Sequence, residues 1–429
     1  MSTSNAGAVA EEGEKTFPYA RKCPFTPPPE YARMVEQDVS QVTLDGSGLR
    51  IWTITNYRTI RELLTDPRVS ASRKHDNFPF YFVAPPEYRT ETSFIGYDGK
   101  EHTTTRRKAA LTFTSRQVKR LRPRIEQIVD EHLEKLLTMP PPVDFHRAFA
   151  LSVPMTVICE LLGIPQDQHD FFIKHGTALL GGHSSPEERQ AAIVEVNAYV
   201  AELIRLKKRE PGDDLLSRAM ADYEASGEEY TDRDLFNMVR LLMNGGHETT
   251  ASQISLGTAC LLENPDQLAL LLADPSLIGS AVEELVRIAT IGDTAVPRVA
   301  LEDIEIGGTT IRKGDGILCL GLAGNRDPEV FPEPDRLLIT RGSRKHLGFG
   351  HGVHHCIGAD LARLELEIVW SKLFQRIPSL RLAKPFLEIP RKEGAVIYGL
   401  WELPVTWDEA DAQPGTAATQ SAPTTEETR

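Results

Sequence analysis

The sequence predicts a mainly α-helical fold, with one large helical domain and a smaller β-rich portion. Two stretches, 39–55 and 303–319, contain paired alternating runs around glycine-rich turns, which is typical of β-hairpins. Most of the remainder carries apolar residues at spacings of three and four, as in residues 122–139, which is typical of helices with one buried face. No internal repeat or linker interrupts the pattern, so we expect one domain over residues 17–407.

The two ends of the chain differ from this domain. Residues 1–16 and 408–429 have too few apolar side chains to order themselves. We therefore predict a disordered tail at each end.

Charge and composition exclude several classes of protein. The formal net charge of −13 argues against a nucleic-acid-binding protein. No run approaches the 18 or more apolar residues of a membrane span. Five scattered cysteines without a CxxC pair indicate a reducing compartment. We expect a cytoplasmic protein that binds neither nucleic acid nor membrane.

A long helix is predicted over residues 231–264. Thr231 is a suitable N-cap, with Asp234 three residues later. A continuous helix of this length would span about 50 Å, enough to cross the whole domain.

The centre of this helix has an unusual composition. Gly245 and Gly246 each cost about 1 kcal/mol relative to alanine. They directly precede His247, Glu248 and Thr249, which are polar residues in a segment otherwise suited to burial. One interpretation is a solvent-facing kink. The other is a widened helix against a ligand, where Glu248 and Thr249 supply an acid and an alcohol for proton delivery.

Glu284 and Arg287 stand three residues apart in a helical stretch, which puts both charges on one face. Alone, such a pair is most often a solvated surface pair of small energetic value.

In the stretch 346–363, HLGFGHGVHHCIGADLAR, Cys356 follows Gly348, Gly350 and Gly352 in the sequence. A helix is predicted to begin at this point. Glycines at this density let the backbone approach a partner closely. A helix N-terminus also favours the thiolate form of cysteine. The stretch therefore predicts a thiolate held against a large flat partner.

Zinc and phosphate are the two alternative ligands of this loop. Zinc would need His354, His355 and Cys356, but three consecutive residues cannot easily aim at one tetrahedral ion. A GxGxxG phosphate loop would need glycine where Val353 or His355 stands.

Together these stretches resemble the cytochrome P450 family. Residues 349–358 (FGHGVHHCIG) match its cysteine-loop signature, and residues 245–250 (GGHETT) its oxygen-activation motif. Glu284 and Arg287 correspond to its core ion pair. The segments FPYARKCPF, HETTAS and LARLELEI are similar to those of soluble bacterial members of the actinomycete type.

The resemblance implies a haem b cofactor with the Cys356 thiolate as its axial iron ligand. A thiolate ligand favours O–O bond cleavage. The residues implied to contact haem are His102, Arg106, Arg298 and His354 at the propionates, with Phe349, Gly350 and Gly245 elsewhere.

The implied activity is a monooxygenase that inserts one atom of O2 into an organic substrate by hydroxylation or epoxidation, in secondary metabolism or xenobiotic oxidation. Glu248 and Thr249 would deliver the protons. By family analogy the substrate pocket includes Asn244, Thr294, Val296 and Ile397, and its mostly apolar segments indicate a mid-sized, mostly apolar substrate. Asn244 stands where relatives commonly have an aliphatic residue; it would make the pocket more polar, or would face a neighbouring helix.

The resemblance also implies partners. No segment of the chain is left for a flavin or nicotinamide domain, so electrons would come from a ferredoxin and its reductase, with NAD(P)H as the ultimate donor. We predict a monomer. A basic docking patch would consist of Arg107, Lys108, Arg116, Arg344 and Lys345, although scattered solvated charges are an equal alternative.

Three other functions remain open. A P450-type nitric oxide reductase lacks the acid that Glu248 supplies, and a peroxygenase does not need the intact Glu248–Thr249 pair. A non-catalytic haem or ligand carrier has no need for buried proton donors.

Overall fold

The computed structural model describes residues 16–45, 47–80, 89, 93–110, 113–180, 185–227, 230–292, 296–393 and 395–412. Most of both predicted tails lies outside these ranges. The described chain runs past the predicted domain end at 407 into a short 3₁₀ helix, Glu409–Ala412. Its Asp411 carbonyl accepts a hydrogen bond from Arg376 Nη1 at 2.7 Å, which holds this segment against the domain.

The prediction of a mainly α fold with a smaller β portion is confirmed. The described α-helices are α1 (Tyr31–Gln37), α2 (Tyr57–Leu63), α4 (Gly99–Ala110), α5 (Ser115–Leu137), α6 (Ser152–Leu162), α7 (His169–Leu180), α8 (Pro186–Arg209), α9 (Leu215–Ser226), α10 (Asp232–Leu262), α11 (Pro265–Ala273), α12 (Ile278–Ile288), α13 (Gly321–Gly324) and α14 (Ala359–Arg376). The described strands are β1 (Val39–Thr43), β2 (Arg50–Ile54), β3 (Val69–Ser70), β4 (Val143–Asp144), β5 (Pro297–Ala300), β6 (Ile304–Ile306), β7 (Thr309–Ile311), β8 (Gly316–Cys319), β9 (Arg381–Leu382) and β10 (Pro404–Thr406).

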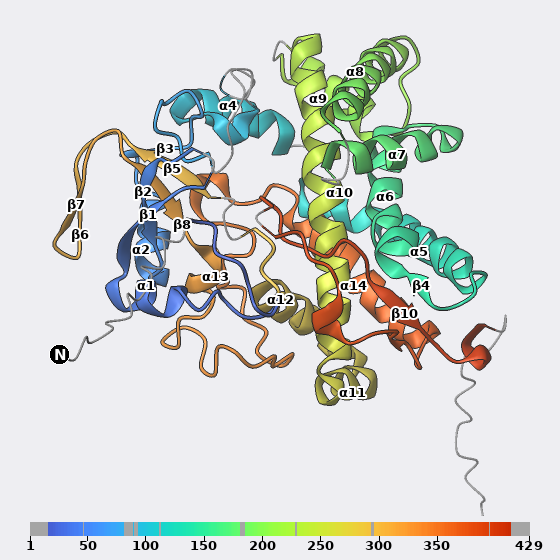
Figure 1. Cartoon of the computed structure of the whole chain (residues 1–429). Helices are drawn as coiled ribbons and strands as arrows, with labels where there is room; N and C mark the ends of the chain where they lie inside the picture. Colours follow the sequence, from blue (N-terminus) through green and yellow to red (C-terminus); the bar gives the residue numbers. More distant parts are fainter. Residues whose placement is uncertain are drawn as a thin grey trace, which may run out of the picture.

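Both predicted hairpins are present. β1 pairs antiparallel with β2, and β6 pairs antiparallel with β7. In the described part of the chain the largest sheet has the order β1-β2-β8-β5-β3, with β2 and β8 parallel. Figure 1 shows this sheet beside α1 and α2, on the opposite side of α10 from helices α5 to α7.

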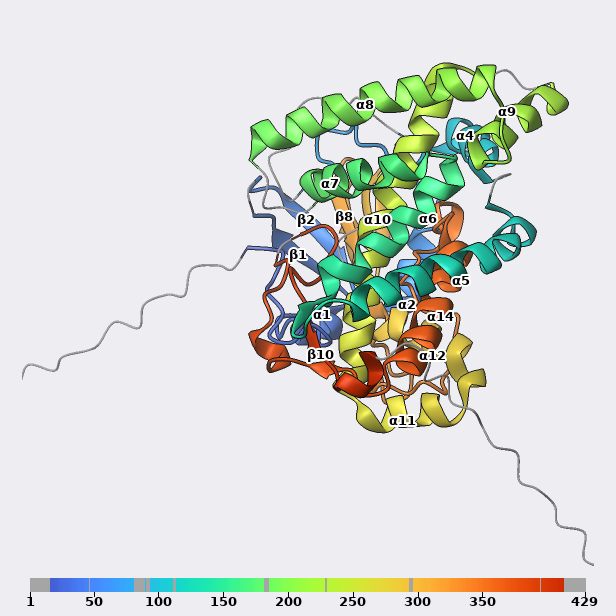
Figure 2. The ribbon, with the colours of Figure 1, turned by 90° about the vertical axis from the view of Figure 1, so that its right-hand side faces the viewer.

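The predicted long helix is α10. Thr231 and Asp234 form a capping box at its start, as the sequence predicted. Figures 1 and 2 show α10 running through the helical portion, with α8 near its first end and α11 at the other. From this position α10 packs against several neighbouring helices, among them α6 and α14.

One contact fixes α10 against α14. Gly257 lies so close to the Trp370 ring that an added Cβ would come within 2.1 Å of Trp370 Cζ2. The Trp370 indole Nε1 also donates to Thr258 Oγ1 at 3.1 Å. Trp370 is fully buried, so the two helices interlock at this point.

Within the described ranges, no helix combines the length and apolar character needed to cross a bilayer.

Candidate active site

The cysteine loop before α14 is held in a fixed turn. Gly350 and Gly352 both have φ of +71°, which glycine adopts without strain. A Cβ on Gly352 would also lie 2.4 Å from the Leu64 carbonyl oxygen at the end of α2. The Cys356 amide donates to the Phe349 carbonyl at 2.9 Å. The glycines therefore allow both the turn conformation and the close approach of the loop to α2.

Cys356 lies just before α14, and its thiol is open to a cavity. Burial raises the pKa of this thiol, whereas the Gly358 N–H and the guanidinium groups of Arg106 and Arg363 oppose the rise. These positive groups favour the thiolate.

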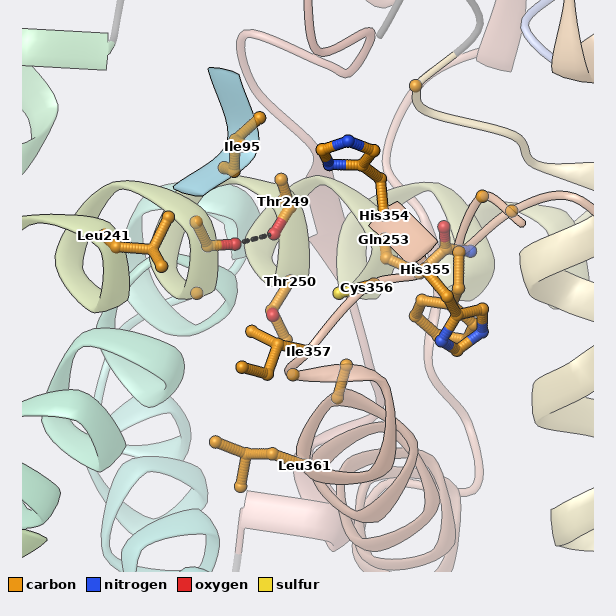
Figure 3. A pocket seen from close by; sticks show the side chains of 18 of the residues that line it. Ile95, Leu241, Thr249, Thr250, Gln253, His354, His355, Cys356, Ile357 and Leu361 are labelled. Atoms are coloured by element: carbon orange, nitrogen blue, oxygen red, sulfur yellow. Dashed lines mark hydrogen bonds between the residues drawn. The ribbon is translucent and has the colours of Figure 1, made fainter. Parts of the chain in front are cut away.

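The cavity has a volume of about 360 Å³ and lies between the cysteine loop, α10, β5 and the loop before β10. Figure 3 shows the Cys356 sulfur on one side and Thr249 and Thr250 of α10 on another, with Ile95 and Leu241 beyond them. Phe349, Gly350, Gly245, Val296 and Ile397 also line it, so most of the predicted cofactor and pocket positions meet here.

Four predicted groups collect at one end of the cavity. The rings of His102 and His354 lie 4.2 Å apart, and His102 Nε2 is buried with no hydrogen-bond partner in the described structure. Arg106 Nη2 donates to the His355 carbonyl at 2.5 Å, and Arg298 Nη1 donates to the Pro297 carbonyl at 2.8 Å. Within the part of the chain that the structure describes, most guanidinium donors of both arginines have no acceptor.

Burial dominates the electrostatics of this end. It lowers the pKa of His354 to about 3, aided by Arg298 and His102. It also lowers the pKa of His102, with Arg106 as the next cause. Both rings are neutral near pH 7 and can donate one hydrogen bond each beside two permanent cations. The set is suited to bind carboxylate groups.

Two glycines of α10 differ in their surroundings. A Cβ on Gly245 would meet no atom within 4 Å, whereas one on Gly246 would lie 2.9 Å from Ile158 Cδ1. Thr249 Oγ1 donates to the Gly245 carbonyl, as the dashed line in Figure 3 marks. Gly246 is needed for packing, while Gly245 leaves open space.

Two predicted pocket residues cannot be placed. Thr294 lies outside the described residues, as does the side chain of Asn244.

Glu248 does not line the cavity beside its neighbour Thr249. Its side chain is buried and forms an ion pair with Lys392, from the loop before β10. The Glu248 carboxylate is thus directed to the Lys392 ammonium group.

Glu284 and Arg287 form a buried ion pair rather than a solvated one. Arg287 Nε and Nη2 each donate to the Glu284 carboxylate at 2.8 Å. Arg341 Nε adds a third contact at 3.1 Å, and Arg287 Nη1 donates to the Asn325 and Pro334 carbonyls at 2.9 and 2.7 Å. The pair ties α12 to the segments that precede the cysteine loop.

A second buried carboxylate, Glu283, was not among the predicted residues. It accepts from His346 Nε2 at 2.8 Å and from Arg363 Nε at 2.7 Å. The Arg363 guanidinium also lies 4.5 Å from the Phe349 ring centroid. These contacts hold the loop between α12 and α14.

Comparisons with known proteins agree with this geometry. The sequence model of the family described as "Cytochrome P450" matches residues 272–378. The chain is 42% identical to cytochrome P450 GfsF of Streptomyces halstedii, over 94% of this chain and 98% of the relative. It is 43% identical to pentalenic acid synthase of Streptomyces avermitilis, over 91% of this chain and 97% of the relative.

A crystal structure of cytochrome P450 MoxA from Nonomuraea recticatena has a TM-score of 0.87 to this structure. It is 43% identical in sequence and covers 92% of this chain and 98% of its own. The chain belongs to the cytochrome P450 family. The predicted fold and enzyme class are thereby confirmed: P450 enzymes are monooxygenases that bind haem b.

The residues of this P450 fit haem b. Haem b carries two propionate groups, which are anionic. In the described structure His102 Nε2 has no hydrogen-bond partner, and Arg106 and Arg298 each have guanidinium N–H groups without an acceptor, so these side chains suit the propionates. The Cys356 thiol faces the same cavity and would hold the haem iron as its thiolate. The zinc alternative finds no support, since no three His, Cys, Asp or Glu residues form a metal-binding group within the described ranges.

Sequence reasoning missed three residues of the P450 site. Lys392 has no local motif, and its partner is 144 residues away. His355, which the sequence analysis considered only as a zinc ligand, lines the cavity. Glu365 is fully buried at the cavity wall, and burial raises its pKa well above the usual value. The last could have been found as a carboxylate at a helix position surrounded by apolar residues.

Proposed function

We propose that this P450 inserts one atom of O2 into a mid-sized, mostly apolar organic substrate, with electrons from an external ferredoxin and its reductase. The observation that carries the proposal is one cavity shared by the Cys356 thiol, the Thr249 hydroxyl and a wall of apolar side chains. Bound haem would supply the activation of O2 and the oxidation of carbon. The chain supplies binding, orientation and protons.

The substrate end of the cavity supports an apolar ligand. Its aliphatic side chains come from four segments: Ile95, Leu241, Leu242, Ile291, Val296 and Ile397. Such walls bind by excluding water, with few polar groups to fix orientation. A pentalenic acid synthase and a vitamin D3 dihydroxylase among the relatives support an organic substrate.

The proton donors would be Thr249 and Glu248. Thr249 holds a hydroxyl proton at the cavity wall, with the Gly245 carbonyl as its resting acceptor. Glu248 is the adjacent residue on α10 and would return a proton to Thr249 after each transfer. A buried carboxylate suits this role because its surroundings exclude bulk water.

Replacing Gly245 with alanine should test the size of the substrate end. We expect a higher melting temperature, because alanine favours the helix by about 1 kcal/mol and its methyl meets open space. Affinity for the bulkiest ligands should fall about tenfold, because the methyl occupies their volume. Binding is followed by the substrate-induced change in haem spin state across a panel of small and branched ligands.

The matched control is Gly246→Ala, in which alanine gives the same increase in intrinsic helix stability. Its methyl must displace Ile158, so the melting temperature should not rise. Unchanged ligand discrimination in Gly245→Ala would mean that the substrate does not reach this bend.

Ferredoxin docking would use the face beside the cysteine loop. Arg106 joins α4 to this loop, and Ser115 joins α5 to Asp360 of α14 through a 2.6 Å hydrogen bond. Arg107 and Arg116 are exposed next to these two contacts. Arg344 and Lys345 are exposed just before the loop, whereas Lys108 is partly buried against Asp234. We therefore restrict the proposed docking patch to the four exposed residues.

The test is substrate oxidation under ¹⁸O₂ with a ferredoxin and its reductase, where the product should gain one labelled oxygen atom. Changing Arg107, Arg116 and Lys345 to glutamine should lower ferredoxin-supported kcat/KM about tenfold at low salt, since the charges steer association. Peroxide-supported turnover should be unaffected.

A control triple variant neutralises Arg50, Arg58 and Lys313, which are exposed on the β-rich portion. It should leave both rates unchanged. Equal losses in the ferredoxin and peroxide assays would refute the docking patch, and product without ¹⁸O would refute the monooxygenase proposal.

A further inference from the structure

A largely buried cation packs against the cysteine loop. Arg363, on the second turn of α14, has only 13% of its side chain exposed. Its guanidinium group lies 4.5 Å from the centroid of the Phe349 ring. The Phe349 carbonyl accepts a hydrogen bond from the Cys356 amide at 2.9 Å. One residue of the loop therefore contacts both the arginine and the backbone of the cysteine.

Glu283 fixes the orientation of this guanidinium group. Arg363 Nε donates to Glu283 Oε1 at 2.7 Å, and Arg363 Nη2 donates to Glu283 Oε2 at 3.2 Å, which is a two-point contact. Glu283 is buried on α12 and also accepts from His346 Nε2 at 2.8 Å. His346 Nδ1 in turn accepts from the Gly348 N–H at 3.1 Å. The carboxylate that orients Arg363 is thus itself bonded to the segment that begins the loop.

Two opposite charges of this cluster are permanent near pH 7. Burial acts to raise the pKa of the Glu283 carboxyl, but the hydrogen bonds from His346 and Arg363 outweigh it and lower the pKa to about 2. An arginine guanidinium group is always charged in proteins. The positive charge of the pair lies on the Phe349 ring, whereas the negative charge lies on α12.

A fixed positive charge beside a redox centre favours the reduced form. Reduction transfers one electron from the ferredoxin to the haem iron that Cys356 would hold, so the site gains one negative charge. The attraction is strong where little water separates the charges and weak for exposed groups, which water and salt screen. Arg344 provides the contrast, because its Nε lies 3.2 Å from Glu283 Oε1 but 73% of its side chain is exposed.

We propose that Arg363 is a positioning residue that acts through the cysteine loop: held by Glu283 on the Phe349 ring, its charge makes bound haem easier to reduce. This inference rests on the proposed role of Cys356 as the iron ligand. In the described structure Phe349 lines the cavity and Arg363 does not, so the charge acts across the ring. Burial and contacts around the axial ligand are among the means by which a protein sets a haem potential.

The experiment measures the reduction potential of the haem-loaded enzyme by spectroscopic titration with chemical mediators, so that ferredoxin docking does not enter. Arg363→Gln should lower the equilibrium constant for reduction about tenfold, which is about 59 mV for a one-electron couple. Arg363→Lys keeps the charge and should stay within about twofold of the wild type. Arg344→Met is the matched control: it removes an exposed charge from the same carboxylate and should also stay within about twofold.

A double variant covers the case in which the single variant does not fold. Arg363→Gln leaves the Glu283 carboxylate buried with part of its bonding lost, whereas Glu283→Gln/Arg363→Gln removes both charges of the pair. The equilibrium constant for reduction should still be about threefold below that of the wild type in the double variant, because the lost positive charge is the one that contacts the Phe349 ring.

A wild-type potential in Arg363→Gln and in the double variant would overturn the role of Arg363. A fall in Arg363→Lys or Arg344→Met as large as that in Arg363→Gln would overturn it as well, because the effect would then not come from the buried charge. The difference spectrum with carbon monoxide separates these results from the proposed function. If the wild type lacks the thiolate band, Cys356 does not hold the iron, whatever the potentials show for Arg363.

Discussion

Replacing Cys356 with serine is expected to abolish substrate oxidation, with rates falling at least about a hundredfold. An alcohol does not ionise near neutral pH, so bound haem iron would lose the thiolate ligand that favours O–O cleavage. The fold should persist, because serine has nearly the same volume and residue 356 is open to the cavity. The measurement is the absorbance difference spectrum of the reduced protein with and without carbon monoxide, in which the red-shifted thiolate band should disappear.

Cys23→Ser is the matched control. Cys23 is half-buried, and it is not among the residues that line the cavity. Its serine variant should keep the wild-type spectrum and activity. A thiolate-type band that survives in Cys356→Ser would mean that another group binds the iron.

Replacing Arg287 with methionine is expected to have the largest effect on stability, about 3–5 kcal/mol of unfolding free energy. The variant would leave the Glu284 carboxylate buried with part of its bonding lost. It would also strip donors from the Asn325 and Pro334 carbonyls. Denaturant unfolding monitored by circular dichroism gives the free energy, and the haem content of the purified protein gives a second readout.

Arg122→Met provides the comparison for this loss. Arg122 is 45% exposed and pairs with Glu126 at 3.5 Å and Glu367 at 2.8 Å on the surface. Its replacement should cost less than about 1 kcal/mol. Similar losses in the two variants would show that burial of the Arg287 pair contributes nothing beyond an ordinary surface contact.

The elements that sequence predicted best are those defined by neighbouring residues. The hairpin over 39–55 follows from alternation around a turn, and α10 from apolar spacing and the Thr231–Asp234 capping box. The cysteine loop was predicted for the same reason, since its turn requires glycine at 350 and 352.

Sequence could not show how Glu248 is directed. Its position on α10 was predictable, but the choice between the cavity and Lys392 depends on a loop 144 residues away. Likewise, the spacing of Glu284 and Arg287 shows that they can pair, but not that Arg341, 57 residues beyond Glu284, adds a third contact. Local spacing carries no information on which distant segment completes a charge pair.

The contact between Gly257 and Trp370 has a consequence for the evolution of new activities. α14 begins three residues after Cys356, and Thr249 lies eight residues before Gly257 on α10. The indole ring packed against the Gly257 backbone is thus one of the contacts that fix the helix bearing the Thr249 hydroxyl relative to the helix that follows the Cys356 sulfur. Residues of the apolar lining can change one at a time as the enzyme acquires new substrates. Residue 257 cannot change in this way, because any larger side chain would collide with Trp370 and move α10 relative to α14.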